Sequence, residues 1–295
     1  MDFLISTARK VRTLLECIKF EHSIFALPFA LTGALLASES FPSLHVIFWI
    51  VVAMFGGRSG AMAMNRLIDS RYDRINPRTK NWPFSSGLIS KYELFVFALL
   101  SFGLLVFASY MLNPLCFYLS PVAIFLLVFY SYTKRFTSLS HIFLGLCWAM
   151  APMGAWIAIR GEFSWRIVPL CFASLFMVAG FDIIYALQDV EFDRSVGLYS
   201  IPAKFGVDFS LMVSRLFHIF TWLLLLYIFF SFKLGALYLV GILIVGILFL
   251  VEHIIIWGGD LSRIDIAFFH VNATIGIMIL LFTMADLLIR RAWGF

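Results

Sequence analysis

Apolar stretches of about 20 residues recur along almost the whole chain, and they constrain its fold more than any other feature. A helix needs about 20 predominantly apolar residues to cross the hydrocarbon core of a bilayer. Of the 295 residues, 62% are hydrophobic and only 13% are charged, whereas soluble domains carry about 25% charged residues. We therefore expect an integral, multi-pass membrane protein whose outer faces contact lipid.

Nine stretches are candidate spans. They cover residues 22–38, 44–66, 92–112, 114–131, 141–159, 166–188, 209–231, 234–257 and 266–288. We predict an all-α fold of about nine transmembrane helices in one domain over residues 1–295, because the alternating strands of a membrane barrel are absent from the sequence. Residues 1–21 are charged and amphipathic and lack the pattern of a cleaved signal peptide, so we expect them to be retained on the cytoplasmic side.

Basic residues are unevenly distributed between the two sides that these spans define. Most lysines and arginines fall on the side of the N-terminus, which the positive-inside rule places in the cytoplasm. The two long connections, at about 67–91 and 189–208, fall on the same side, and long loops are often functional. We expect a bacterial cytoplasmic membrane protein with its active site facing the cytoplasm. Nucleic acid is not an expected partner, because no basic tract carries interleaved aromatics.

Two acidic clusters stand where a predicted span leaves the membrane on this side. Asn65, Asp69 and Asp73 follow one another at four-residue intervals, so a helix places them on one face. Asp189 and Asp193 repeat the same step in the second half of the chain, and the stretches NRLIDSRYDR and YALQDVEFDR align with each other. The match is a hint of internal duplication.

Carboxylates this close together repel one another and are costly near lipid unless a cation joins them. Oxygen ligands suit Mg²⁺, which readily shares its coordination shell with substrate phosphates. Two acidic faces, one from each half of the chain, are suited to hold metal ions with a diphosphate between them. The alternative is that both clusters are solvated helix ends whose carboxylates pair with nearby arginines.

Arg58 lies seven residues before Asn65, on the same predicted helix face and about 10 Å deeper in the membrane. A charge at that depth marks a functional site by default, and Arg58 is a candidate to bind an anionic group of a substrate. The alternative is an internally paired or snorkelling arginine. The other candidates to bind phosphate oxygens are Arg78, Lys134, Arg135, Tyr185 and Lys204, although membrane topology or interfacial packing would also account for each.

The two motifs resemble the signatures of the UbiA superfamily of membrane prenyltransferases. The first reads N65-R-L-I-D69-S-R-Y-D73, and the second reads Y185-A-L-Q-D189-V-E-F-D193 with Asp182 upstream. The segments YSYTKRFT and GLYSIPAKFG also look like this family, and the similarity covers essentially the whole chain. The resemblance implies a helical bundle around a central cavity and the Mg²⁺-dependent transfer of a polyprenyl group from its diphosphate to an aromatic acceptor.

By the same resemblance, residues of both motifs hold the Mg²⁺–diphosphate, Arg58 faces the carboxylate of the aromatic substrate, and Lys134 and Arg135 lie near the diphosphate. The residues that the motifs assign to metal and catalysis are Asn65, Asp69, Asp73, Asp189 and Asp193.

The sequence departs from the family pattern at two positions. Arg66 replaces the usual aspartate after the first asparagine, as it does in one subgroup, and Trp82 replaces a usual arginine in the following loop. The subgroup resembles 4-hydroxybenzoate polyprenyltransferases of isoprenoid quinone biosynthesis. Two alternatives remain open from the sequence: a dihydroxynaphthoate acceptor in menaquinone biosynthesis, and a membrane transporter without enzymatic activity.

Overall fold

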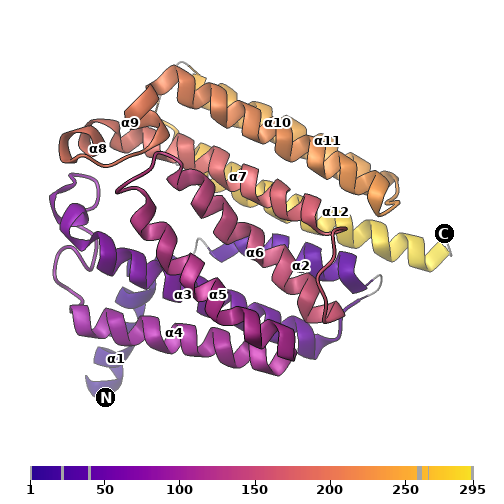
Figure 1. Cartoon of the computed structure of the whole chain (residues 1–295), viewed down its shortest axis with the longest axis horizontal. Coiled ribbons are helices and arrows are strands. Elements are labelled where there is room, and N and C mark those ends of the chain that lie inside the picture. The colour runs from indigo at the N-terminus through magenta and orange to yellow at the C-terminus, as the bar shows by residue number, and fades with distance from the viewer. Residues whose placement is uncertain (1, 21–22, 39–40, 258–260, 265, 294–295) are drawn as a thin grey trace.

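The computed structural model describes residues 2–20, 23–38, 41–257, 261–264 and 266–293. Within these residues the fold is entirely helical (Figure 1). The helices are α1 (Asp2–Cys17), α2 (Ser23–Ser38), α3 (Leu44–Ile75), α4 (Lys91–Leu112), α5 (Pro114–Thr133), α6 (Ser140–Arg160), α7 (Val168–Ala186), η2 (Leu187–Asp189), α8 (Val190–Val196), α9 (Ile201–Phe205), α10 (Val207–Ser231), α11 (Ala236–Ile255), η4 (Ile266–Val271) and α12 (Asn272–Trp293).

The predicted class of fold is confirmed. Among the described residues, 8 helical segments are long and apolar enough to cross a membrane, and α2 is a shorter apolar helix. Each of the nine predicted stretches therefore corresponds to an apolar helix of the bundle. The predicted amphipathic N-terminus forms α1, which runs outside the bundle beside α4 (Figure 1); residues 1 and 21 of that prediction lie outside the described part of the chain.

Helix α3 is longer than the sequence suggested. It has 32 residues and continues to Ile75, so at 1.5 Å per residue it measures about 48 Å, against about 30 Å for the hydrocarbon core of a bilayer. The predicted span ended at residue 66, and the charged residues that follow are instead the last turns of the same helix. The helix therefore presents Asn65, Asp69 and Asp73 at one end of the bundle.

Glycines let neighbouring helices approach closely. A Cβ at Gly56 would lie 2.7 Å from the backbone oxygen of Ser101 on α4, and one at Gly60 would lie 2.6 Å from the Phe102 ring. A Cβ at Gly145 would lie 2.5 Å from the Leu175 oxygen, where α6 packs on α7. Small residues at such positions are the usual means of close packing between helices in lipid.

The second acidic cluster does not lie on one continuous helix. α7 ends at Ala186, the short helix η2 covers Leu187–Asp189, and α8 begins at Val190. Asp189 has φ −107° and ψ 7°, outside the helical region, so the chain bends between Tyr185 and Asp193. The connection predicted at 189–208 is thus largely helical, formed by α8 and α9.

Segments far apart in the sequence meet at one end of the bundle, on the left in Figure 1. We call this assembly the cap and define it as residues 76–90, residues 134–139, α8 and α9. The backbone N–H of Tyr199 donates to the carbonyl of Lys134 at 2.7 Å, and the Asn76 side chain donates to Asp189 at 3.0 Å. These bonds join the two halves of the chain where both acidic clusters lie.

Candidate active site

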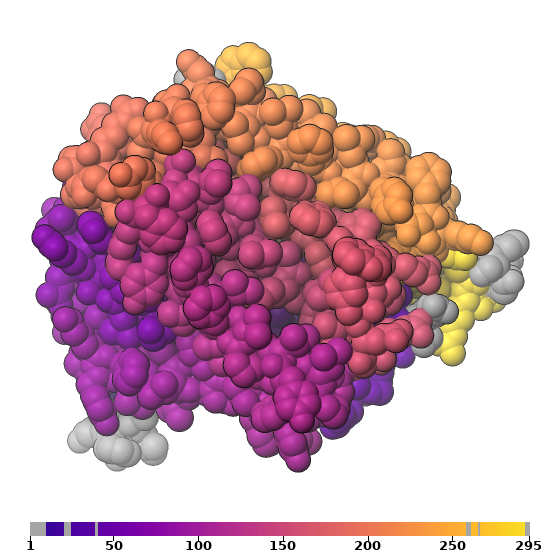
Figure 2. Space-filling view, viewed as in Figure 1, coloured from indigo at the N-terminus to yellow at the C-terminus, as the bar shows by residue number. Residues whose placement is uncertain are grey.

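A cavity of about 1140 Å³ extends from the cap into the bundle. Asp69 lines it at the cap end and Leu112 lines it near the α4–α5 turn, so it reaches through most of the depth of the bundle. Its inner walls are mainly apolar. Leu119 and Leu146 both line the cavity and are 41% and 39% exposed. A recess is visible between α5 and α6 (Figure 2).

The first acidic cluster is buried and paired with cations. Asp69 is 2% exposed, and its carboxylate lies 2.9 Å from Nζ of Lys134 and 3.4 Å from Nη2 of Arg135. The amide of Asn65 donates to Asp69 at 3.0 Å. Asp73 pairs with Arg66 at 3.5 Å. Both aspartates and Asn65 line the cavity, as the four-residue spacing predicted for one helix face.

The second cluster is held by the loop that follows the first. The guanidinium of Arg78 donates to both oxygens of Asp189, with Nε at 3.0 Å, and its Nη1 donates to the Tyr185 hydroxyl at 2.9 Å. Asp193 accepts from the Ser200 hydroxyl at 3.0 Å. These side chains line the same cavity, although the 3-10 turn at residues 187–189 interrupts the helix that carries them.

Two of the basic residues titrate above their ordinary range. Burial works against the charged form of Lys134, but the carboxylate of Asp69 outweighs it and raises the pKa of Lys134. Burial likewise works against the charged form of Arg78, and its hydrogen bond to Asp189 more than compensates, so the pKa of Arg78 is also raised. Both groups therefore stay cationic at neutral pH, which places fixed positive charge beside the acidic clusters.

The oxygen donors of the two clusters fit Mg²⁺. Within the described residues, no three aspartate, glutamate, histidine or cysteine side chains are close enough to share one ion. Mg²⁺ is commonly bound by one or two carboxylates together with waters and substrate phosphates. The donors Asn65, Asp69, Asp73, Asp189 and Asp193 suit that arrangement, in which a diphosphate would supply the remaining oxygens.

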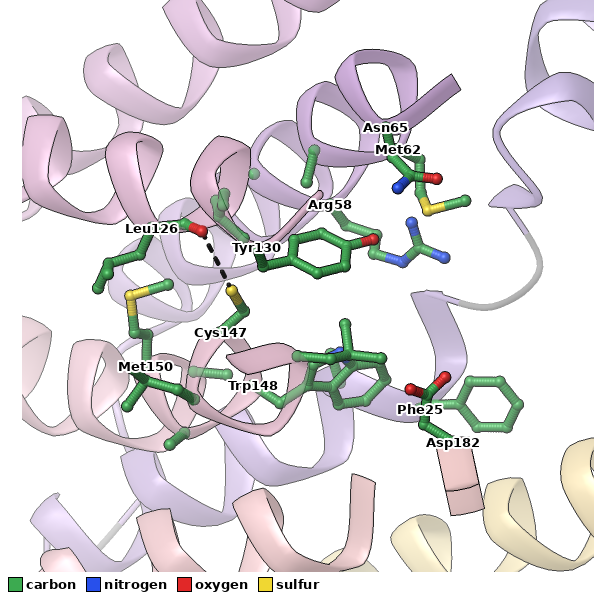
Figure 3. Close-up of a pocket in the computed structure, with 18 of the residues that line it drawn as sticks. Phe25, Arg58, Met62, Asn65, Leu126, Tyr130, Cys147, Trp148, Met150 and Asp182 are labelled. Carbon is green, nitrogen blue, oxygen red and sulfur yellow. Dashed lines mark hydrogen bonds between the residues drawn. The ribbon is translucent and has the colours of Figure 1, made fainter. Parts of the chain in front are cut away.

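The two acidic clusters form the end of the cavity that we call its mouth. Arg58 lines the cavity deeper in the bundle than this mouth. Its guanidinium and the Tyr130 hydroxyl point into the same open space, from α3 and α5, and the carboxylate of Asp182 points into it from α7 (Figure 3). Tyr130 lies within electrostatic range of Arg58, Asp69 and Asp182. This part of the cavity therefore brings together a cation, a carboxylate and a phenol.

An aromatic cluster closes the cavity beside Asp182. The rings of Phe25 and Phe181 lie 5.9 Å apart, and those of Trp148 and Phe181 lie 6.1 Å apart. Tyr185 stacks on Phe268 at 4.2 Å. These rings come from α2, α6, α7 and η4, so no local sequence pattern could have identified them as one surface.

Not every predicted site residue faces the cavity. Arg135 donates to the backbone oxygen of Ile68 at 2.7 Å and to the carboxylate of Asp69. It is not among the residues that line the cavity, so it supports the first cluster from outside the cavity. Lys204 is exposed on α9, with Nζ 5.2 Å from the Phe205 ring centre, and it is not among the lining residues. No role was predicted for three polar residues that line the cavity, Tyr130, His141 and Asp182. Asp182 alone had a sequence signal, which was its spacing from the second motif.

Comparisons with known proteins agree with this geometry. The model of the UbiA prenyltransferase family matches residues 26–273. The chain is 30% identical over 249 residues to the 4-hydroxybenzoate octaprenyltransferase of Vibrio campbellii, covering 83% of this chain and 86% of that protein. The enzyme of the same name from Shewanella pealeana is 32% identical over 210 residues, covering 70% of this chain and 69% of the relative.

Solved structures share the fold. The apo structure of a UbiA homologue from Aeropyrum pernix K1 superposes with a TM-score of 0.83 at 31% identity, covering 90% of this chain and 98% of the homologue. A UbiA homologue from Archaeoglobus fulgidus, bound to GPP and Mg²⁺, superposes with a TM-score of 0.74 at 20% identity, covering 93% of this chain and 99% of that one.

Proposed function

This chain belongs to the UbiA prenyltransferase family, and from that premise we propose that it transfers a polyprenyl group from a polyprenyl diphosphate to the ring of a hydroxylated aromatic acid of the 4-hydroxybenzoate type. The product would be an intermediate of an isoprenoid quinone. The names of the relatives from Vibrio campbellii and Shewanella pealeana support this acceptor.

The observation that carries the proposal is a single cavity with two chemically different ends. Its mouth combines two acidic clusters with Lys134 and Arg78, while its interior is mainly apolar and is lined by the cation Arg58. A diphosphate with a long hydrocarbon tail has the same division between a charged head and an apolar chain. The transporter alternative is set aside, because the matched family and the named relatives are prenyltransferases.

The residues of the mouth would hold the diphosphate. Asn65, Asp69, Asp73, Asp189 and Asp193 are the residues to hold Mg²⁺, which when bound neutralises the diphosphate as the C–O bond to the prenyl group breaks. Lys134 and Arg78 remain cationic and face the same space, so they would stabilise the same developing charge. Tyr185 lies between the acidic clusters and the aromatic rings, where its hydroxyl accepts from Arg78.

The interior would bind the acceptor and shield the allylic cation. The carboxylate of a hydroxybenzoate suits the Arg58 guanidinium, because arginine binds carboxylates through two parallel hydrogen bonds. The rings of Phe181, Trp148 and Phe268 line the cavity, and aromatic faces stabilise cations held above them. These rings also exclude the water that would otherwise capture the cation.

A dihydroxynaphthoate also carries a carboxylate for Arg58 and a hydroxylated ring, so it is the second acceptor to test. The decisive experiment offers the purified protein, in nanodiscs with Mg²⁺ and one prenyl diphosphate, equal amounts of both acids, and the products are identified by mass spectrometry. We expect the prenylated hydroxybenzoate. If only the naphthoate is prenylated, the proposed hydroxybenzoate acceptor is wrong. If neither acid is prenylated, the proposed transfer reaction is wrong.

The side of the membrane is part of the proposal. The cap carries the basic residues that the positive-inside rule assigns to the cytoplasm. The cap and both acidic clusters would therefore face the cytoplasm. Single cysteines placed at the exposed residues Lys80 and Lys233, each in a background without the native cysteines, would test this in intact cells. An impermeant thiol reagent should label position 233 and spare position 80.

A further inference from the structure

Asp182 stands apart from the aspartates of the two motifs. Three of those four form ion pairs with lysine or arginine, namely Asp69, Asp73 and Asp189, whereas Asp182 is held by a histidine. Its Oδ2 lies 2.7 Å from Nδ1 of His141, and its side chain is 26% exposed while that of His141 is 3% exposed. The carboxylate points into the cavity opposite Arg58 (Figure 3).

The surroundings of His141 determine which of its nitrogens carries the proton. The backbone N–H of Ile201, at the start of α9, donates to Nε2 at 3.3 Å. Because that N–H can only donate, Nε2 must accept, and the proton of the neutral ring is then on Nδ1. Nδ1–H therefore donates to Asp182. This bond engages Oδ2 and fixes the orientation of the carboxylate, so the second oxygen of Asp182 is the one that can act on the cavity.

We propose that Asp182 is the general base of the transfer and that His141 is the residue that positions it. This inference rests on the proposed function. When the acceptor ring attacks C1 of the prenyl group, a C–C bond forms, the C–O bond to the diphosphate breaks, and the ring becomes a cation with a C–H bond at the attacked carbon. Asp182 takes that proton, and the C–H electron pair restores the aromatic ring. The products are the prenylated acid, diphosphate and one proton, so no oxidant or reductant is needed.

The position of Asp182 relative to Arg58 agrees with this role. In a 4-hydroxybenzoate the carbon ortho to the hydroxyl lies on the side of the ring away from the carboxylate. If Arg58 on α3 binds the carboxylate, the attacked carbon faces the mouth and α7, which carries Asp182 one turn before Tyr185. The rival base is the departing diphosphate, which also lies on that side.

Ring-deuterated acceptor separates these two bases. The test compares wild type with Asp182→Asn, using hydroxybenzoate deuterated at both positions ortho to the hydroxyl. We expect Asp182→Asn to lower kcat by about 10²- to 10⁴-fold, with little change in the KM for prenyl diphosphate. We also expect a larger deuterium isotope effect in the variant than in wild type, because loss of the proton becomes slow. A kcat within a few-fold of wild type, with an unchanged isotope effect, would overturn the assignment and favour the diphosphate.

Variants of His141 test the positioning role. His141→Asn keeps a donor close to the place of Nδ1, whereas His141→Phe removes it, so the first should retain more activity and show the smaller isotope effect. Equal activity and isotope effect in the two variants would overturn the role of His141. Asp208→Asn is the matched control, since Asp208 is exposed at the start of α10, outside the cavity.

Folding and the proposed function are checked separately. Binding of a non-hydrolysable prenyl diphosphonate reports whether each variant keeps its fold. If Asp182→Asn does not bind it, Asp182→Glu replaces it, and that variant should still show a raised isotope effect because its carboxylate is displaced. An unchanged isotope effect in Asp182→Glu would then overturn the assignment. A wild-type protein that transfers no prenyl group to any acid would instead overturn the proposed function, and the inference with it.

Discussion

The guanidinium carbon of Arg66 lies 3.8 Å from the centre of the Trp82 ring. Both positions differ from the motif pattern that the resemblance leads one to expect, and the structure shows that they contact each other. Arg66 also pairs with Asp73 and donates to the backbone oxygen of Cys17 at 3.3 Å. The pair thus ties α1 and the cap segment 76–90 to the end of α3, and Trp82 in turn lies 5.4 Å from the Arg78 guanidinium.

Replacing Trp82 should loosen the cap. We expect Trp82→Ala to lower the free energy of unfolding by about 1–2 kcal/mol, since it removes the stacking partner of the buried Arg66, and to speed proteolysis within residues 76–90. Trp82→Phe should lower the free energy of unfolding by less, because it keeps an aromatic face for Arg66. Trp165→Ala is the control, as Trp165 is 79% exposed at the other end of the bundle. Equal unfolding midpoints for Trp82→Ala and Trp165→Ala would contradict the structural role of the pair.

Removing one carboxylate from either cluster should abolish transfer. We expect Asp69→Ala and Asp189→Ala each to lower the rate by at least about 10²-fold in membranes supplied with Mg²⁺ and prenyl diphosphate. Each variant also frees a basic partner, Lys134 or Arg78, so the thermal unfolding midpoint is measured beside the rate. Transfer near the wild-type rate in both variants would show that the clusters do not bind the metal.

Metal and diphosphate should bind cooperatively. The aspartates Asp69 and Asp189 are ion-paired with Lys134 and Arg78 in this structure, so Mg²⁺ alone must compete with those cations, whereas a diphosphate engages them. We expect isothermal titration to show weak Mg²⁺ binding to the free protein and at least about 10-fold tighter binding with prenyl diphosphonate present. The same factor must appear in the diphosphonate affinity when Mg²⁺ is added. Chelation of Mg²⁺ should stop transfer reversibly. If Mg²⁺ binds with the same affinity with and without the diphosphonate, the proposed coupling is wrong.

Arg58 should select acceptors that carry a carboxylate. We expect Arg58→Ala to reduce kcat/KM for 4-hydroxybenzoate by about 30-fold or more, because the carboxylate loses a desolvated cationic partner. With phenol, which lacks the carboxylate, the variant and wild type should have similar kcat/KM values. Steady-state kinetics with both acceptors test this, and prenyl diphosphate binding serves as the internal control. An equal loss with acid and phenol would indicate that Arg58 has a structural role only.

The sequence alone was sufficient to predict the helical bundle, because a span is encoded by contiguous apolar residues. Their transfer into lipid is favourable wherever they pack. It also placed Asn65, Asp69 and Asp73 on one face, since four-residue spacing follows from the geometry of one helix. The second cluster was harder to predict. Its spacing suggested the same regular face, and the bend at Leu187–Asp189 became visible only in the folded chain.

The tertiary structure decided which charges are partners. Arg78 with Asp189, Arg66 with Trp82, and His141 with Asp182 join residues that are distant in sequence or lie on different elements. Such pairs depend on how helices and the cap pack, which hydropathy and local periodicity do not encode. The sequence therefore determined that this is a membrane bundle with two acidic motifs, while the packing of α3, α7 and the cap brought those motifs to one cavity and placed Asp182 opposite Arg58 inside it.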